Sequence, residues 1–274
     1  MIDGVKIAVV TGGGHGIGRA ICRRLAQEGI KVVVADIDGD AGQKVATEIH
    51  GRALTIDVSE ENQIRDMIKE VEDGIGPIDL FVSNAGVGFG DRNGWAASRD
   101  GMLNADQDRW ETCWKINVMA HVYVARYVVP RMIGRGGGYL VNIASAAGLL
   151  SQIGDAAYTA SKHATVAFAE SLAITHGEQG IHVCLVCPQA VATRMIGLGD
   201  DSGNESGGFG GNDVDGILRP EEVADCIVEG IEKKRFLILP HPDVAKYMER
   251  KANNRERWIA GMQRFRQSVT GQTD

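Results

Sequence analysis

The feature that most constrains how this chain can fold is a glycine-rich run that joins two segments of different periodicity. The apolar residues 5–10 are typical of a strand buried on both faces, and Thr11–Gly18 follows them directly. From Ile17 to Leu25, apolar side chains recur at helical spacing. Glycine tolerates positive φ and the close approach of a ligand, and a helix N-terminus presents unpaired N–H groups that suit a phosphate. The run therefore predicts a strand-to-helix turn able to hold a phosphate group.

A second apolar segment supports this interpretation because it ends in an acidic residue. Residues 31–35 are typical of another buried strand, and Asp36 follows them, twenty residues after Gly16. A carboxylate at this position can accept hydrogen bonds from the adenosine ribose hydroxyls of a dinucleotide. The alternative is a tight turn that binds nothing, and the position of Asp36 favours a dinucleotide site over it.

Strand and helix patterns alternate along most of the chain. The predicted strands are 5–11, 31–36, 53–57, 78–83, 138–144, 182–187 and 235–239. The predicted helices are 16–28, 40–49, one that begins at Ser59, 110–130, 157–176 and 220–233. This order predicts a three-layer α/β fold of the Rossmann type, with a parallel, doubly wound sheet of about seven strands.

Two segments lie outside the alternation. The glycine-rich stretch 199–216, within a loop at about 194–219, is predicted to be mobile and to cover a substrate, or to be a surface loop without a role. The tail is predicted to be helical, and its Trp258 and Met262 need either the body of the protein or another subunit to pack on. We therefore predict one catalytic domain, 1–240, and a helical extension, 241–274.

The composition narrows the classes of protein to which the chain can belong. Of its 274 residues 44% are hydrophobic, and a net charge of −7 is spread over interspersed acidic and basic residues. This pattern indicates a soluble protein and excludes a nucleic-acid footprint, and no segment is long and apolar enough for a membrane span. The first strand begins too close to Met1 for a signal peptide. Five scattered cysteines predict free thiols in a reducing cytoplasm.

One cysteine pair has the spacing of a redox or metal motif. Cys184 and Cys187 are three residues apart on a predicted strand, so their side chains should point to opposite faces of the sheet. No metal site is therefore predicted.

A second group of residues carries chemistry. Tyr158 and Lys162 are four residues apart on a predicted helix and share one face, where an ammonium would lower the pKa of a phenol. Ser145 follows a predicted strand, which places it at the carboxyl end of the sheet, where ligands bind in such folds. Each feature alone is common, and their joint occurrence after a dinucleotide pattern predicts an acid–base site.

Together these motifs resemble the short-chain dehydrogenase/reductase family over residues 5 to 240. Thr11–Gly18 matches its TGxxxGxG loop, and Asn84–Gly86 matches its NAG motif. Pro188–Thr193 matches a segment that usually reads PGxxxT, with Gln189 in place of the glycine. The residues that match the catalytic tetrad of the family are Asn117, Ser145, Tyr158 and Lys162.

The resemblance implies a role for each residue of the tetrad. Tyr158 would be the general acid and base, and Lys162 would lower its pKa and hold the nicotinamide ribose. Ser145 would stabilise charge on the substrate oxygen, and Asn117 would anchor a water that relays protons. The residues expected around the dinucleotide are Gly12, Gly14, His15, Gly16, Ile17, Gly18, Asp36, Ile37, Asp57, Val58, Asn84, Ala85, Gly86, Tyr158, Lys162, Pro188, Val191 and Thr193.

NAD is the expected cofactor because Asp36 would repel the 2′-phosphate of NADP. Ile37 and His15 stand where NADP-preferring relatives usually carry Arg or Lys, although Arg19 could reach a phosphate. The expected activity is hydride transfer between NAD(H) and a secondary alcohol or ketone. The alternatives are a dinucleotide-binding regulatory protein, which should have lost Tyr158 or Lys162, and an NAD-dependent epimerase or isomerase.

The substrate and the assembly are less constrained by the sequence. Apolar residues in the predicted pocket loops suggest a largely apolar small molecule, and they are Leu149, Leu150, Ile153, Met195, Ile196, Leu198 and Phe209. Helices 110–130 and 157–176 are apolar on several faces, which one sheet cannot cover. The resemblance places both helices at a subunit interface, so a homotetramer, or a homodimer, is expected.

Overall fold

The computed structural model of the protein describes residues 2–89, 106–198 and 215–270, and these contain one seven-stranded parallel sheet. The strands lie in the order β3-β2-β1-β4-β5-β6-β7. Their bounds are Ile7–Thr11 (β1), Lys31–Asp36 (β2), Arg52–Thr55 (β3), Leu80–Ser83 (β4), Gly138–Ile143 (β5), Ile181–Val186 (β6) and Leu237–Ile238 (β7). This confirms the predicted parallel, doubly wound sheet.

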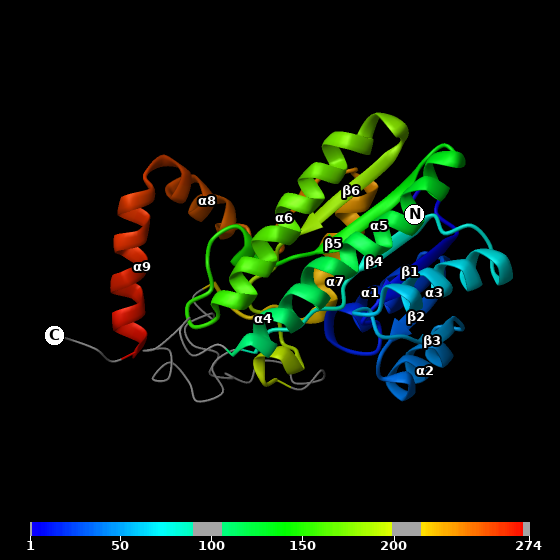
Figure 1. Ribbon diagram of the computed structural model, residues 1–274, viewed down its shortest axis with the longest axis horizontal. Coiled ribbons are helices and arrows are strands. Elements are labelled where there is room, and N and C mark those ends of the chain that lie inside the picture. The colour runs from blue at the N-terminus through cyan, green and yellow to red at the C-terminus, as the bar shows by residue number, and fades with distance from the viewer. Residues whose placement is uncertain (1, 90–105, 199–214, 271–274) are drawn as a thin grey trace.

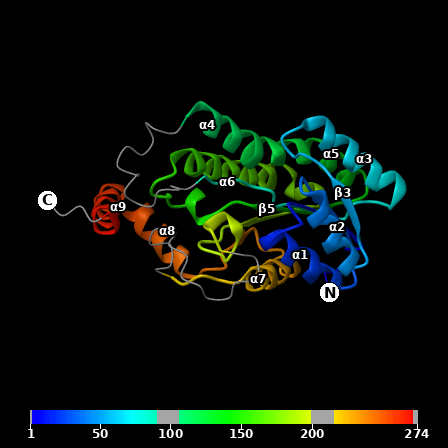
Figure 2. The same ribbon diagram turned by 90° about the horizontal axis from the view of Figure 1, so that it is seen from below.

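Helices cover both faces of the sheet (Figure 1, Figure 2). One face packs against α1 (Gly16–Gln27), α2 (Gly39–Glu48) and α7 (Pro220–Glu232). The other face packs against α3 (Glu61–Gly74), α5 (Ala120–Gly134) and α6 (Ala156–His176). Each layer has its own apolar cluster on its side of the sheet, because strands buried on both faces present alternate side chains to the two sides.

The two cysteines with motif-like spacing lie on opposite faces, as predicted. Cys184 belongs to the cluster beneath α1 and α7, and Cys187 belongs to the cluster beneath α5 and α6. Both are buried and neither forms a disulfide.

The helix predicted over 110–130 differs from the observed one. It begins earlier, as α4 (Gln107–Trp114), passes through one π-helical turn (Lys115–Met119) and continues as α5 beyond Pro130. Proline removes one helical N–H, but Val128, Val129 and Met132 remain buried on the same side, so packing on the sheet sustains the helix. The start predicted at Ser59 is also shifted, since Glu60 precedes the first residue of α3.

The tail is helical, as predicted, and consists of two helices. α8 spans Asp243–Asn253 and α9 spans Arg255–Thr270, with the Asn254 carboxamide accepting a hydrogen bond from the Arg257 N–H at 2.8 Å. Both helices lie beyond the carboxyl ends of the strands, the end toward which β6 points in Figure 1.

The glycine-rich stretch falls outside the described residues except for 215 and 216, as do Phe209 and the segment 90–105. Within the described chain, no helix is long and apolar enough to cross a membrane.

Two glycines, one in the loop after β1 and one in the first turn of α1, are required by the local geometry. Gly12 has φ +62°, a left-handed conformation that favours glycine. A methyl group on Gly18 would lie 2.0 Å from the Gly12 carbonyl oxygen and 2.5 Å from Nδ2 of Asn84. The first turn of α1 can therefore approach the loop only because Gly18 has no side chain.

We predict that Gly18→Ala lowers the free energy of unfolding by about 1–3 kcal/mol, because the added methyl group forces backbone apart from backbone. Gly74→Ala, at the end of α3, is the matched control: its methyl group would meet nothing within 4 Å. Urea unfolding of the two variants measures the difference. Equal stabilities would contradict the close approach of Gly18 to Gly12.

Candidate active site

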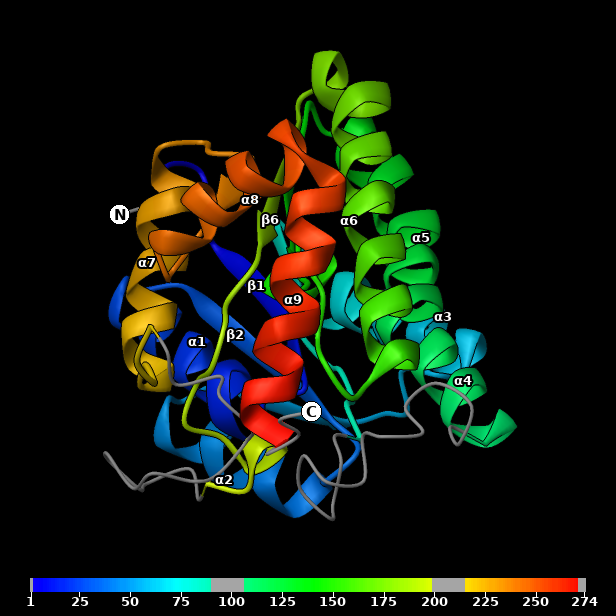
Figure 3. The same ribbon diagram turned by 90° about the vertical axis from the view of Figure 1, so that its left-hand side faces the viewer.

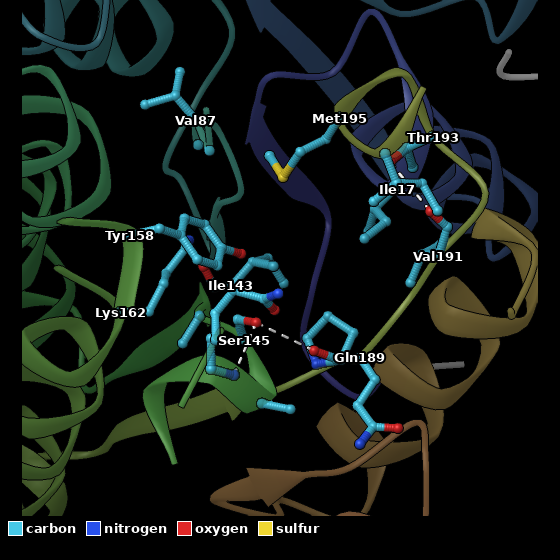
Figure 4. Close-up of a pocket in the computed structure, with 18 of the residues that line it drawn as sticks. Ile17, Val87, Ile143, Ser145, Tyr158, Lys162, Gln189, Val191, Thr193 and Met195 are labelled. Carbon is cyan, nitrogen blue, oxygen red and sulfur yellow. Dashed lines mark hydrogen bonds between the residues drawn. The ribbon is translucent and has the colours of Figure 1, made fainter. Parts of the chain in front are cut away.

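The functional side chains gather where the strand order reverses, at the carboxyl ends of the neighbouring strands β1 and β4. A cavity of about 660 Å³ opens there (Figure 4). Most of the residues expected around the dinucleotide line it, namely Gly12, His15, Gly16, Ile17, Asp36, Ile37, Asp57, Val58, Asn84, Ala85, Gly86, Tyr158, Lys162, Pro188, Val191 and Thr193. The structure thus brings together segments from across the first 193 residues.

Three predicted residues do not line this cavity. Gly14 lies behind its wall and donates its N–H to the Asp36 carboxylate at 2.8 Å. Gly18 packs against Gly12, as described above. Asn117 is fully buried behind Val87. They support the cavity wall rather than form it.

Asn84 ties the ends of β1 and β4 together. Its side-chain amide donates to the carbonyl oxygens of Thr11 and Gly12, at 2.9 and 3.1 Å. In return, the Thr11 hydroxyl accepts hydrogen bonds from the N–H groups of Asn84 and Ala85 at 3.0 and 3.2 Å. This reciprocal set fixes the glycine loop against the loop after β4.

The carboxylate of Asp36 is buried, with 8% of the residue exposed, and it is held from two sides. One oxygen accepts from Gly14, and the other accepts from the N–H of Asp38 at 2.9 Å. A carboxylate has about four acceptor positions, so it retains capacity for two ribose hydroxyls. The side chain next in sequence, Ile37, is apolar and 69% exposed.

A chain of contacts joins the glycine loop to the segment after β6. Nε2 of His15 lies 3.0 Å from a carboxylate oxygen of Asp38 and 3.1 Å from Nη1 of Arg194. Arg194 therefore lies beside His15, where the cavity borders the glycine loop. Sequence reasoning missed Arg194, whose only signal was its position directly after Thr193.

Ser145, Tyr158 and Lys162 lie together on one wall of the cavity (Figure 4). The Ser145 hydroxyl donates to the Pro188 carbonyl oxygen at 3.4 Å and accepts from the N–H of Ala147 at 3.1 Å. It also hydrogen-bonds Tyr158, which lowers the pKa of the phenol. Serine, phenol and amine thus converge on the same space at the carboxyl end of β5.

Asp155 positions Tyr158 and was not predicted. One oxygen of Asp155 caps α6 by accepting from the Tyr158 N–H at 2.9 Å, and the other accepts from the N–H of Phe89 at 3.1 Å. A capping residue of this type three positions before Tyr158 was a readable signal.

The predicted effect of Lys162 on Tyr158 differs from the structure. Desolvation raises the pKa of Tyr158 to about 12, against the expected lowering, and it outweighs the hydrogen bond from Ser145. Lys162, which is 2% exposed, has a pKa lowered by burial to about 8. Its Nζ donates to the Ile143 carbonyl oxygen at 3.0 Å and lies 5.7 Å from the centre of the Tyr158 ring. The amine is directed at the backbone of β5 rather than at the phenol oxygen.

Asn117 lies on the π-helical turn and is bonded through every polar side-chain atom. Its Oδ1 accepts from the Val87 N–H at 2.9 Å, and its Nδ2 donates to the Val87 carbonyl at 2.9 Å and to the Ser161 hydroxyl at 3.0 Å. The backbone carbonyl of Asn117 accepts from the Thr165 hydroxyl at 2.6 Å. The side chain therefore holds the segment after β4 against α6.

A buried polar pair lies behind Lys162. Nδ1 of His121, on α5, is 2.9 Å from Oδ1 of Asn142, on β5. Among the described residues, neither Nε2 of His121 nor Nδ2 of Asn142 has a hydrogen-bond partner. Burial, and next the charge of Lys162, lowers the pKa of His121 to about 4, so the imidazole is neutral at pH 7.

The comparisons with known proteins agree with this geometry. The family described as short chain dehydrogenase matches residues 6–200. The chain is 35% identical over 245 residues to 1-deoxy-11-beta-hydroxypentalenate dehydrogenase of Streptomyces exfoliatus, covering 87% of this chain and 84% of that protein. It is 35% identical to meso-2,3-butanediol dehydrogenase of Serratia marcescens, covering 69% and 73%. A solved short-chain dehydrogenase/reductase from Burkholderia phymatum, in complex with NAD, is similar with a TM-score of 0.79 and 28% identity, covering 93% and 96%.

His121 should make the protein less stable in acid. Because its folded-state pKa is about 4 and an unfolded histidine has about 6.5, the unfolded chain binds a proton first as pH falls, and stability is lost between these values. We predict that His121→Gln loses less unfolding free energy than wild type between pH 7 and pH 5. His50→Asn, at an exposed position, is the control. An unchanged pH dependence in His121→Gln would contradict the buried neutral imidazole.

Proposed function

This chain belongs to the short-chain dehydrogenase/reductase family, and from that premise we propose that it transfers a hydride between a nicotinamide dinucleotide and a secondary alcohol or ketone. The observation that carries the proposal is the convergence of Ser145, Tyr158 and Lys162 on the cavity that also borders the glycine loop. A protein that only senses a dinucleotide would need none of these three side chains at that point.

The residues of the cavity fit a dinucleotide. His15, which precedes α1, makes no capping hydrogen bond with its side chain within the described part of the chain, whereas Asp38 and Asp155 cap α2 and α6. The first N–H groups of α1 therefore remain available to a phosphate at the cavity wall. We propose that Gly12, Gly16 and Ile17 hold the pyrophosphate and that Asp36 holds the adenosine ribose.

The chemistry divides between the cofactor and the protein. When bound, the nicotinamide accepts a hydride from the alcohol carbon or donates one to the ketone carbon. Tyr158, whose raised pKa keeps its phenol protonated at pH 7, donates its proton to the oxygen of a ketone and takes it back from an alcohol. The Ser145 hydroxyl orients that oxygen and stabilises charge on it. Lys162 contributes an amine 5.7 Å from the centre of the Tyr158 ring, and Asn117 keeps the neighbouring wall in place.

We further propose that the cofactor is NAD rather than NADP. A 2′-phosphate on the adenosine ribose would meet the buried carboxylate of Asp36, and the apolar Ile37 offers it no compensating charge. Asp38 adds a second carboxylate nearby. His15 contacts this carboxylate, and Arg194 contacts His15. The solved relative from Burkholderia phymatum contains NAD, which agrees with this choice.

A homotetramer, or a homodimer, is the assembly we propose. α6 leaves Ile174 exposed and α4 leaves Trp114 exposed, so apolar side chains remain uncovered on the helical layer of the predicted interface. Light scattering at micromolar concentration should give a mass two or four times the 29.4 kDa of the chain. A mass of one chain would contradict the proposal.

The unpaired cysteines support a reducing compartment such as the cytoplasm.

Tyr158→Phe tests the acid–base role. The substitution keeps the ring and removes the hydroxyl, so turnover should fall by at least about a hundredfold while dinucleotide binding, measured by calorimetry, is retained. Tyr139→Phe, at a partly buried tyrosine of β5 outside the cavity, is the control. Turnover within a few-fold of wild type in Tyr158→Phe would refute the assignment.

The ratio of kcat/KM for NAD to that for NADP tests the cofactor preference. Wild type should favour NAD, Asp36→Ala should shift the ratio toward NADP by at least roughly tenfold, and adding Ile37→Arg should reverse it. Gln179→Arg introduces the same charge at an exposed position before β6, outside the cavity lining, and should leave the ratio unchanged. A wild-type preference for NADP would show that Asp36 does not face the ribose.

A further inference from the structure

The cavity extends beyond Ser145 and Tyr158 to the tail of the chain. α8 contributes Tyr247 and Arg250 to its lining, and α9 contributes Trp258, Met262 and Phe265. The three residues of α9 stand at positions i, i+4 and i+7, which form one face of a helix. In Figure 3, α9 lies across the carboxyl end of the sheet, between α7 and α8 on one side and α6 on the other.

The face of α9 that borders the cavity differs from its outer face. Trp258, Met262 and Phe265 are partly buried, whereas Ile259, adjacent in sequence to Trp258, is 50% exposed and does not line the cavity. The apolar face of α9 therefore borders the cavity of its own chain.

The tail is attached to the segment that follows Ser145. Nζ of Lys251, near the end of α8, donates to the carbonyl oxygens of Leu149 and Leu150 at 2.7 and 2.6 Å. Leu150 and Val244 form a small apolar cluster against which Trp258 packs. The position of the tail is thus coupled to the turn that begins at Ser145.

A second contact holds α8 from the other side. The Tyr247 hydroxyl donates to a carboxylate oxygen of Asp215 at 2.8 Å, and Asp215 itself borders the cavity. The apolar side chains Leu150, Met195 and Ile196 also line the cavity, with Met195 drawn into it in Figure 4. Apolar side chains from three segments therefore border the space beyond the Tyr158 hydroxyl.

We propose that α8 and α9 form the outer wall of the substrate chamber, and that this chamber takes a secondary alcohol or ketone with a bulky apolar group. This inference rests on the proposed hydride transfer. The carbonyl end of the substrate lies at Ser145 and Tyr158, and the apolar group lies against Met262 and Phe265. Lys251 is a positioning residue that holds this wall in place.

A homologous series of methyl ketones, from butan-2-one to decan-2-one, tests the chamber in the full-length protein. In wild type, kcat/KM should rise by about fourfold for each added methylene once the chain reaches α9. Met262→Ala and Phe265→Ala should each lower kcat/KM for decan-2-one by roughly tenfold, because KM rises. Their kcat/KM for butan-2-one should stay within about twofold of the wild-type value. Ile259→Ala, on the outer face of the same helix, should match wild type throughout the series.

Lys251→Met tests the positioning role. It removes both hydrogen bonds to the turn and should raise KM for decan-2-one severalfold, and raise KM for butan-2-one less. Lys251→Arg keeps a donor and should restore most of the lost affinity. A fall in kcat for every ketone, without rescue by arginine, would assign Lys251 a general structural role and overturn this part of the proposal.

The outcomes separate this inference from the proposed function. If butan-2-one and decan-2-one are both reduced and the α9 variants have the wild-type kcat/KM for each ketone, the tail is not the chamber wall and the inference fails. If wild type reduces no ketone of a broad panel with NADH or NADPH, the proposed function fails first. A chain-length preference that persists in the variants would place the apolar group elsewhere and also overturn the inference.

Discussion

The hydrogen bonds between Asn84 and the end of β1 are the interaction on which the site depends. The sheet reverses its strand order between β1 and β4, and the loops from these strands diverge there. Asn84 closes that point by donating to two carbonyl oxygens, and Thr11 accepts two N–H groups in return. The glycine loop, the approach of Gly18 and the cavity floor all follow from this junction, because it fixes where α1 begins relative to β4.

Burial then sets the electrostatics of the opposite wall. Desolvation raises the pKa of Tyr158 and lowers that of Lys162, so each group is shifted toward its uncharged form. A phenol kept protonated at pH 7 is suited to donate a proton, as the proposed reduction of a ketone requires. The polar support comes from behind: Asn117 fixes the wall at Val87, and Lys162 bonds the backbone of β5.

Much of this arrangement could be predicted from the sequence, because it depends on local patterns. Alternating apolar strands and amphipathic helices predicted the sheet, and residues at strand ends, such as Asp36 and Ser145, were placed at the cavity edge. The direction of the Tyr158 pKa shift could not be predicted, since it sums burial and charges from several elements. Because α5 packs on the sheet, the helix continues past Pro130, although proline usually ends or kinks a helix. The apolar side chains of the tail indicated that it packs on the body of the protein or on another subunit. Only the tertiary structure shows that the apolar face of α9 borders the cavity of its own chain.

Whether this cavity carries out hydride transfer is decided by an isotope measurement. The protein is incubated with a methyl ketone and reduced nicotinamide dinucleotide deuterated at both C4 positions, and the product is analysed by mass spectrometry. Hydride transfer should give an alcohol with one deuterium on its carbinol carbon, together with stoichiometric oxidation of the cofactor. Product without deuterium, or no product while the dinucleotide binds tightly, would contradict it.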